Sequence, residues 1–227
     1  MTSPPTAIKD SWVTGAVGRL WRILEARLRP APIATVNALK TFLEEHSSLI
    51  AQKCAIDYCR GKTGLASFAL FTEKPFIDAL TVCRWETFVI VLGDLMLIAE
   101  GQLRAHAAAE QRALMQEALF DLYSSVVVPL PALPHRPDGW HDAIAAFTTR
   151  LKNAGAGEPK RALDVADHSA KRLFDTLPIH ASMRELDKEV VYGAVRFRMI
   201  AVSQEMQRRL HAADLVKQLL DAQYVTL

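Results

Sequence analysis

Apolar residues recur at steps of three and four along most of the chain, which is the spacing of an amphipathic α-helix. The first such segment runs from Ile8 to Leu28 and stops before Pro30 and Pro32, which cannot continue a helix. Similar segments, bounded by capping residues, glycines or prolines, follow as far as about Leu210. They predict helices over residues 8–28, 35–60, 72–109, 110–126, 138–153, 159–177 and 182–210. We therefore expect an all-α protein, a single bundle of about seven or eight helices.

The prolines concentrate in one stretch, residues 129–137, which reads PLPALPHRP. Proline lacks a backbone N–H and restricts the residue before it, so no helix passes through this stretch. We expect a strap across the bundle or a stiff linker, and the alternative is a peptide-like ligand for an aromatic groove. The expected organisation is an N-terminal amphipathic helical arm (1–32), a helical core (33–128), the Pro-rich strap (129–138) and C-terminal helices that complete the bundle (139–227).

One acid interrupts the most apolar segment of the chain. Residues 88–99 read FVIVLGDLMLIA, with Asp94 near the middle. The flanking segments are good helix formers, so we predict a helix here, and two strands that turn at Gly93-Asp94 are the alternative. Burying a lone carboxylate is costly, so Asp94 needs a partner, a proton or a function.

Other charged residues can share the environment of Asp94. Glu86 and Glu100 are fourteen residues apart, which places them within about 40° of each other around a helix. Together with polar residues of the preceding helix they could line an interhelical pocket. The alternative is a buried structural network, such as an Arg60–Asp94 pair, that fixes helix register. The candidate ligand-binding residues are Asp94, Glu86, Glu100, Arg60, Asp57, Tyr58 and Arg84.

The last long helical segment, Ser182–Leu210, has two apolar stripes. It opens with a capping box, Ser182 to Glu185. A helix with two apolar faces contacts two neighbours, so this one is either central to its bundle or shared with a second subunit. One stripe is Met183, Leu186, Val190, Gly193, Phe197 and Ile200, and the other is Val191, Val195, Met199, Val202, Met206 and Leu210.

The sequence contains no complete catalytic or cofactor motif. Gly61-Lys62-Thr63 matches the end of a phosphate-binding loop, but Ile56 stands where that loop needs a glycine. No Glu-x-x-His pair of a diiron bundle occurs, and the three cysteines have neither redox-motif nor zinc-site spacing. Asp164 and His168, four residues apart on a predicted helix, indicate a surface ion pair. We expect no cofactor and no metal site, and buried free thiols.

These observations favour a non-enzymatic interaction or scaffold protein that acts through helix surfaces as a homodimer, with self-association through Ser182–Leu210. The alternatives are a binder of an apolar small molecule or lipid near Asp94, and a helical enzyme that uses buried carboxylates as acid or base. The net charge of +2 is too small to favour nucleic acid. The first residues lack a secretory signal, so we expect a cytoplasmic protein, with peripheral membrane contact through Ile8–Arg29 as a lesser possibility.

Overall fold

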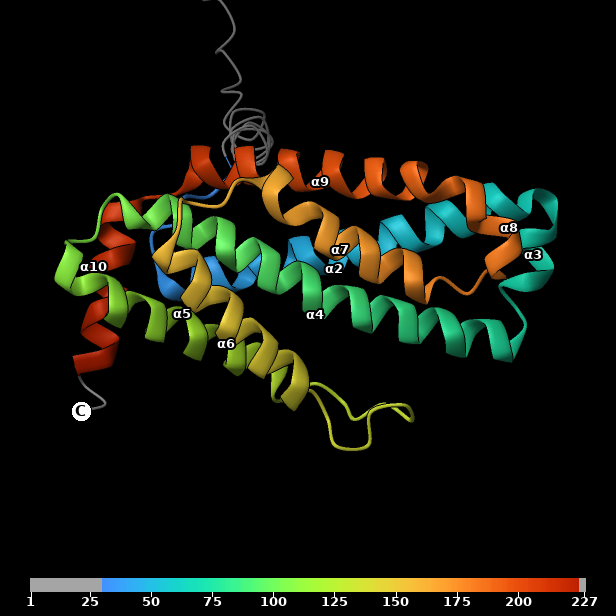
Figure 1. Ribbon diagram of the computed structural model, residues 1–227, viewed down its shortest axis with the longest axis horizontal. Helices are drawn as coiled ribbons and strands as arrows, with labels where there is room; N and C mark the ends of the chain where they lie inside the picture. Colours follow the sequence, from blue (N-terminus) through green and yellow to red (C-terminus); the bar gives the residue numbers. More distant parts are fainter. Residues whose placement is uncertain (1–29, 225–227) are drawn as a thin grey trace, which may run out of the picture. The chain divides into compact units, whose positions relative to one another are not determined.

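The computed structural model describes residues 30–224, with side chains through Asp221. From Ile33 onward the described elements belong to one compact unit. It is an all-α bundle, as predicted, and no strand occurs in the described residues. The predicted N-terminal arm lies outside the description except for residues 30–32. The long helices are α2 (Val36–Thr63), α4 (Lys74–Arg104), α5 (Arg112–Val127), α6 (His141–Ala156), α7 (Ala162–Thr176), α9 (Lys188–Arg209) and α10 (Ala212–Tyr224), and the short elements are η1 (Gly64–Ala66), α3 (Ser67–Leu70), η2 (Ala109–Gln111), α8 (Ala181–Arg184) and η3 (Glu185–Asp187) (Figure 1).

Helix α4 is the centre of this bundle. It packs against α2, α5, α6, α7, α9 and α10, and from Glu86 to Glu100 every residue except Ile90 is buried. A helix that is apolar on all sides must be covered on all sides, which explains why the other elements surround it. The segment around Gly93-Asp94 is continuous helix, so the hairpin alternative is wrong. No helix in the described part of the chain has the length and apolar content that crossing a bilayer requires.

A glycine inside α4 lets two other helices approach closely. A Cβ atom at Gly93 would lie 3.2 Å from Cδ2 of Phe147 on α6 and 3.6 Å from Cε2 of Tyr123 on α5. The rings of these two residues stack on each other with centroids 4.0 Å apart. The missing side chain therefore allows this aromatic pair to lie directly on the backbone of α4.

Backbone hydrogen bonds join the start of α2 to the junction between α9 and α10. The N–H of Ile33 donates to the carbonyl of Arg209 over 2.8 Å, and the N–H of His211 donates to the carbonyl of Ile33 over 3.0 Å. Thr35 then caps α2 by accepting the N–H of Ala38. Distant parts of the sequence are thus held together at this end of the bundle.

The Pro-rich segment connects α5 to α6 through a series of turns. Leu130 and Leu133 pack against the core, and the guanidinium of Arg136 lies 4.5 Å from the ring centroid of the buried Trp140. Helix α6 begins after Trp140 instead of at the predicted Asp138, because Gly139 has a φ of 76°, which is not helical.

The last predicted helix does not begin at its capping box. His180 caps the short α8, and η3 separates it from α9. Asp187 precedes α9, but its carboxylate accepts hydrogen bonds from Tyr58 and Lys62 on α2 and does not cap the helix. These contacts to α2 hold the chain in a turn where the local sequence favours a continuous helix.

Candidate functional site

Three carboxylates on α4 are almost fully buried. Glu86 is 4 % exposed and both Asp94 and Glu100 are 0 % exposed. They are eight and six residues apart along the helix, so they face α5, α6, α7 and the Pro-rich segment at three successive levels of the bundle. The partners of these carboxylates decide whether the three acids form a functional site or stabilise the fold.

Asp94 is paired with side chains of α6 and α7. Arg150 of α6 donates to Oδ1, and the hydroxyl of Ser169 on α7 donates to Oδ2. Nδ1 of His168 lies 3.2 Å from Oδ1. Both carboxylate oxygens are therefore engaged, and the charge is balanced by Arg150, not by the Arg60 that we expected.

Glu86 is held by the Pro-rich segment. Arg136 donates to both of its oxygens, over 3.1 Å for the Nη2–Oε2 bond, and Nε2 of His135 lies 2.8 Å from Oε1. Arg172 of α7 comes within 3.5 Å of Oε2. Burial raises the pKa of Glu86, but the hydrogen bonds from Arg136 and His135 outweigh it, so this pKa lies below its ordinary value.

Glu100 and Arg104 form a buried pair one turn apart on α4. The guanidinium donates to both carboxylate oxygens, over 3.0 and 2.6 Å. It also donates to the carbonyls of Ala154 and Gly157 at the C-terminus of α6. Arg104 thus donates to carbonyls in the last turn of α6, one of which, that of Ala154, also accepts the N–H of Gly157, and it joins α4 to α6.

The remaining candidates lie away from Asp94. Arg60 stacks over Phe71 at 5.5 Å, and Asp57 pairs with Arg198 of α9 over 3.1 Å. Tyr58 donates to Asp187 over 2.9 Å, and burial together with this bond raises the pKa of Tyr58 above its ordinary value. The seven candidates therefore do not form one pocket.

Sequence reasoning missed most partners of the α4 carboxylates. The expected Asp164–His168 pair is wrong, because Asp164 pairs with Arg161 while His168 faces Asp94. The helical spacing of α7 could have pointed to Ser169. This serine lies on the same buried face of α7 as Val165 and Ala166, where its hydroxyl needs a hydrogen-bond partner. The pairing of Arg136 and Arg150 with these acids could not be predicted in this way, because both arginines lie far from their partners in the sequence.

The three cysteines are free and buried, as expected. Burial raises the pKa of Cys54 to about 11 and that of Cys83 to about 11. Because the thiolate is the reactive form, these thiols are poor nucleophiles at neutral pH. Among the described residues no group of three His, Cys, Asp or Glu side chains is placed to hold a metal ion.

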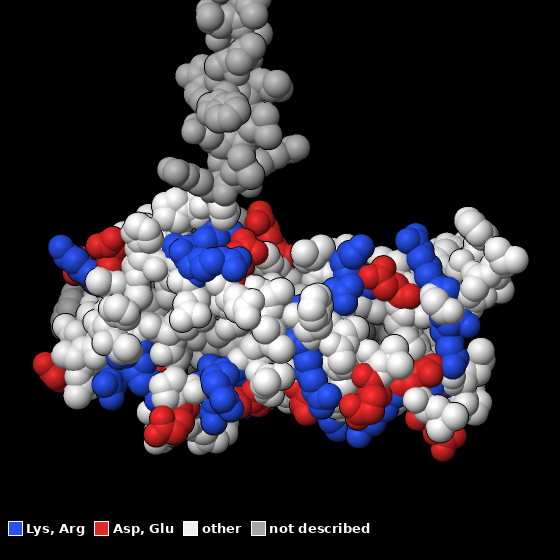
Figure 2. All heavy atoms as spheres, turned by 90° about the horizontal axis from the view of Figure 1, so that it is seen from above, with Lys and Arg blue, Asp and Glu red and all other residues white. Residues whose placement is uncertain are grey.

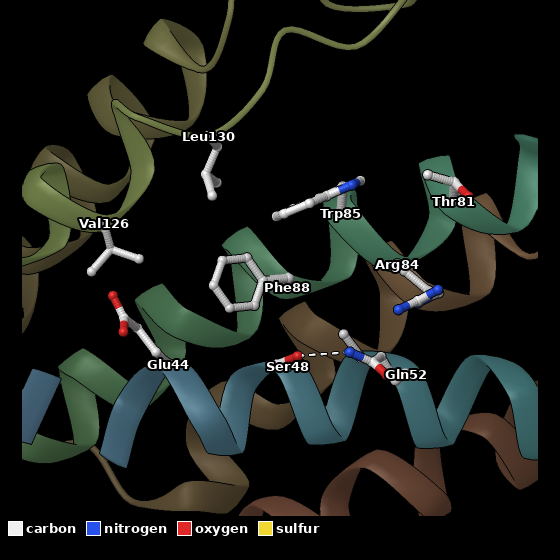
Figure 3. A pocket seen from close by; sticks show the side chains of 10 residues that line it. Glu44, Ser48, Gln52, Thr81, Arg84, Trp85, Phe88, Val126 and Leu130 are labelled. Carbon is white, nitrogen blue, oxygen red and sulfur yellow. Dashed lines mark hydrogen bonds between the residues drawn. The ribbon is translucent and has the colours of Figure 1, made fainter. Parts of the chain in front are cut away.

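A cavity of about 360 Å³ opens between α2, α4 and α5, and Asp94 is not part of its wall. Of the seven candidates only Arg84 lines it, beside the aromatic rings of Trp85 and Phe88 (Figure 3). Nε of Arg84 is buried and makes no hydrogen bond with any residue that the structure describes. A buried donor left in this state costs about 1–3 kcal/mol.

Comparison with known proteins gives no assignment: no protein family, no curated protein and no solved structure matches the chain. Function is therefore inferred from the geometry alone. The carboxylates that looked most like a site are engaged by arginines, whereas two other places in the bundle have no partner among residues 30–224 as the structure describes them. These are the cavity beside Arg84 and the outer face of α9.

Proposed function

We propose that this protein is a non-enzymatic interaction protein that forms a homodimer through the outer face of α9. One observation supports this most strongly. Of the two apolar stripes predicted for this region, Val191, Val195 and Met199 are buried. Most of the other stripe is exposed: Leu186 is 95 %, Val190 65 % and Phe197 73 % exposed, whereas Ile200 is half-buried against the core. Several large apolar side chains exposed along one helix are typical of an interaction surface.

We call Leu186, Val190, Gly193 and Phe197 the α9 face. Further exposed apolar residues are Leu65 of η1 and Phe68 of α3, and Figure 1 shows α3 at the same end of the bundle as α8. Figure 2 looks onto the side where α9 lies, and uncharged side chains occupy much of it, with positive side chains often next to negative ones. Such a mixed surface favours an apolar contact over a purely electrostatic one.

The spacing of the α9 face favours a second helix as its partner. Val190, Gly193 and Phe197 follow one another on α9 at steps of three and four residues, which is the a/d spacing of helices that pack side by side. Leu186 precedes them in η3. A Cβ atom added at Gly193 would meet nothing within 4 Å. The backbone at the middle of the face is therefore open to solvent, and a large side chain of a partner can approach it.

The α9 face itself offers such a side chain. In an antiparallel pair of α9 helices, Phe197 of each copy can pack over Gly193 of the other. Val190 then lies opposite Ile200, which is half-buried against its own core and keeps part of its side chain exposed. The contact is the same in both directions, as a two-fold dimer requires. This self-complementarity is why a second copy of the chain is the occupant that we favour.

Size-exclusion chromatography with light scattering tests the proposal on the full chain at micromolar concentration. We expect about twice the mass of the 25.2 kDa chain. Phe197→Glu should raise the dimer dissociation constant about tenfold or more, because it places a charge in an apolar contact. Val128→Glu is the matched control, since Val128 is 68 % exposed and lies beyond the end of α5. A monomeric wild type, or equal effects of both variants, would contradict the proposal.

We also propose that the protein acts in the cytoplasm. The three cysteines are buried and unbridged, which suits a reducing compartment. Immunofluorescence of the tagged full chain would test this, and staining confined to a membrane-enclosed oxidising compartment would contradict it.

A further inference from the structure

The cavity between α2, α4 and α5 has two unlike ends. Figure 3 shows Glu44 and Val126 on one side and Arg84 with Thr81 on the other, with the side chains of Phe88, Trp85 and Leu130 between them. Its volume of about 360 Å³ lies at the lower end of the roughly 300–1,000 Å³ found for small-molecule sites. The cavity can therefore hold one small ligand with an apolar body.

Arg84 differs from the other arginines that contact α4. Arg104, Arg136 and Arg150 each donate to a buried carboxylate of that helix. Arg84 forms no ion pair with any residue between 30 and 224 that the structure describes, and its buried Nε has no hydrogen-bond acceptor there. A guanidinium presents parallel N–H donors that match a carboxylate. Because Arg84 lines the cavity and has no ion pair among the described residues, its guanidinium suits an anion that enters there.

The rest of the wall specifies what that anion is attached to. The rings of Trp85 and Phe88 meet edge to face, with centroids 5.9 Å apart, and offer an apolar surface next to Arg84. Ser48 and Gln52 on α2 already bond to each other over 2.8 Å. The carboxylate of Glu44 at the far end repels a second negative charge. A ligand with one negative end and an apolar tail suits these three features.

We infer that this cavity binds a free amphiphile with a single negative charge, such as a medium-chain carboxylate, with its head group on Arg84. The apolar chain lies against Trp85 and Phe88 and points toward Leu130. This binding is independent of the dimer, because the cavity lies between α2, α4 and α5 and shares no residue with the α9 face.

Isothermal titration calorimetry of the full chain with decanoate, decanol and decylammonium tests the inference. We expect decanoate to bind in a 1:1 ratio and to bind at least tenfold more tightly than the other two. Arg84→Gln should weaken decanoate binding about tenfold or more and leave decanol unchanged. Arg84→Lys keeps the positive charge but loses the parallel N–H donors of the guanidinium. Its affinity for decanoate should lie between those of wild type and Arg84→Gln.

Two controls make the result decisive. Arg112→Gln removes the same charge at the exposed start of α5, away from the cavity near its end, and should leave decanoate binding unchanged. Circular dichroism melting of each variant shows that it is folded, and Glu44→Gln provides a second variant that should bind decanoate at least as well as wild type. Equal binding of the three probes, or no effect of Arg84→Gln, would overturn the inference.

An anionic lipid head group in a membrane could also bind Arg84, and a separate measurement distinguishes it from a free amphiphile. Phosphatidylglycerol vesicles contain anionic head groups, but their chains are held in a bilayer. We expect Arg84→Gln to have no effect on co-sedimentation with these vesicles. If Arg84 affects vesicle binding and decanoate does not bind, the ligand is a lipid surface and our inference of a free amphiphile is wrong.

Discussion

Helices α4 and α9 both have apolar residues on more than one side, yet α4 is covered on nearly all sides and α9 is covered on one. Around α4 each buried acid has a specific arginine: Glu86 has Arg136, Asp94 has Arg150 and Glu100 has Arg104. On α9 an apolar stripe with the same helical spacing stays exposed. Each buried acid of α4 is thus paired, whereas the exposed apolar stripe has no covering element among the described residues. This difference suggests that the first helix supports the fold and the second meets a partner.

The largest expected effect comes from breaking the most enclosed pair on α4. Arg104→Met leaves Glu100 buried without its counter-charge and frees two carbonyls at the end of α6. We expect a loss of about 3–5 kcal/mol in the free energy of unfolding, measured with urea. Glu100→Gln combined with Arg104→Met should recover part of that loss. A loss below about 1 kcal/mol for the single variant would show that the Glu100–Arg104 pair does not stabilise the fold.

A methyl group at Gly93 tests the close packing around α4. Gly93→Ala places a Cβ atom 3.2 Å from Phe147, so the stacked pair on α5 and α6 must shift. We expect a destabilisation of about 1–3 kcal/mol in urea unfolding. A stabilised variant would mean that α6 can move away from α4 without cost.

Acid should weaken the contact between α4 and the Pro-rich segment. The folded-state pKa of Glu86 is lowered, chiefly by the hydrogen bonds from Arg136 and His135 that outweigh burial. Its carboxylate therefore stabilises the fold above the unfolded pKa of about 4.3, and this contribution is lost as the pH falls through the folded-state pKa. We expect the unfolding free energy to fall less between about pH 6 and about pH 3 for Glu86→Gln than for wild type. Identical slopes would contradict the pairing.

The smallest expected effect on stability is at Gly193, the counterpart of Gly93 on α9. Nothing lies within 4 Å of a Cβ atom there, so Gly193→Ala should stabilise the chain by up to about 1 kcal/mol through helix propensity. Urea unfolding in the Phe197→Glu background separates this effect from dimerisation. In the otherwise wild-type chain the same methyl group should weaken the dimer, because it fills the space that Phe197 of the other copy approaches.

The helical pattern of the sequence was enough to predict the all-α fold and the burial of α4, since both follow from the spacing of apolar residues. The sequence also showed the two apolar stripes of α9. It did not show which of the two stripes is buried, because that depends on where α2 and α7 pack. The partner of Asp94 was predicted wrongly for the same reason: Arg150 is 56 residues away, and no local pattern records such a pairing.

Disulfide cross-linking between two copies tests the central claim most directly, because α9 of one copy must lie against α9 of the other. The native cysteines are buried, so they interfere little. We expect a variant with both Val190→Cys and Ile200→Cys to form a covalent dimer under mild oxidation, and Val190→Cys alone to remain uncross-linked. No covalent dimer from the double variant, or equal cross-linking by the single one, would contradict the antiparallel α9 contact.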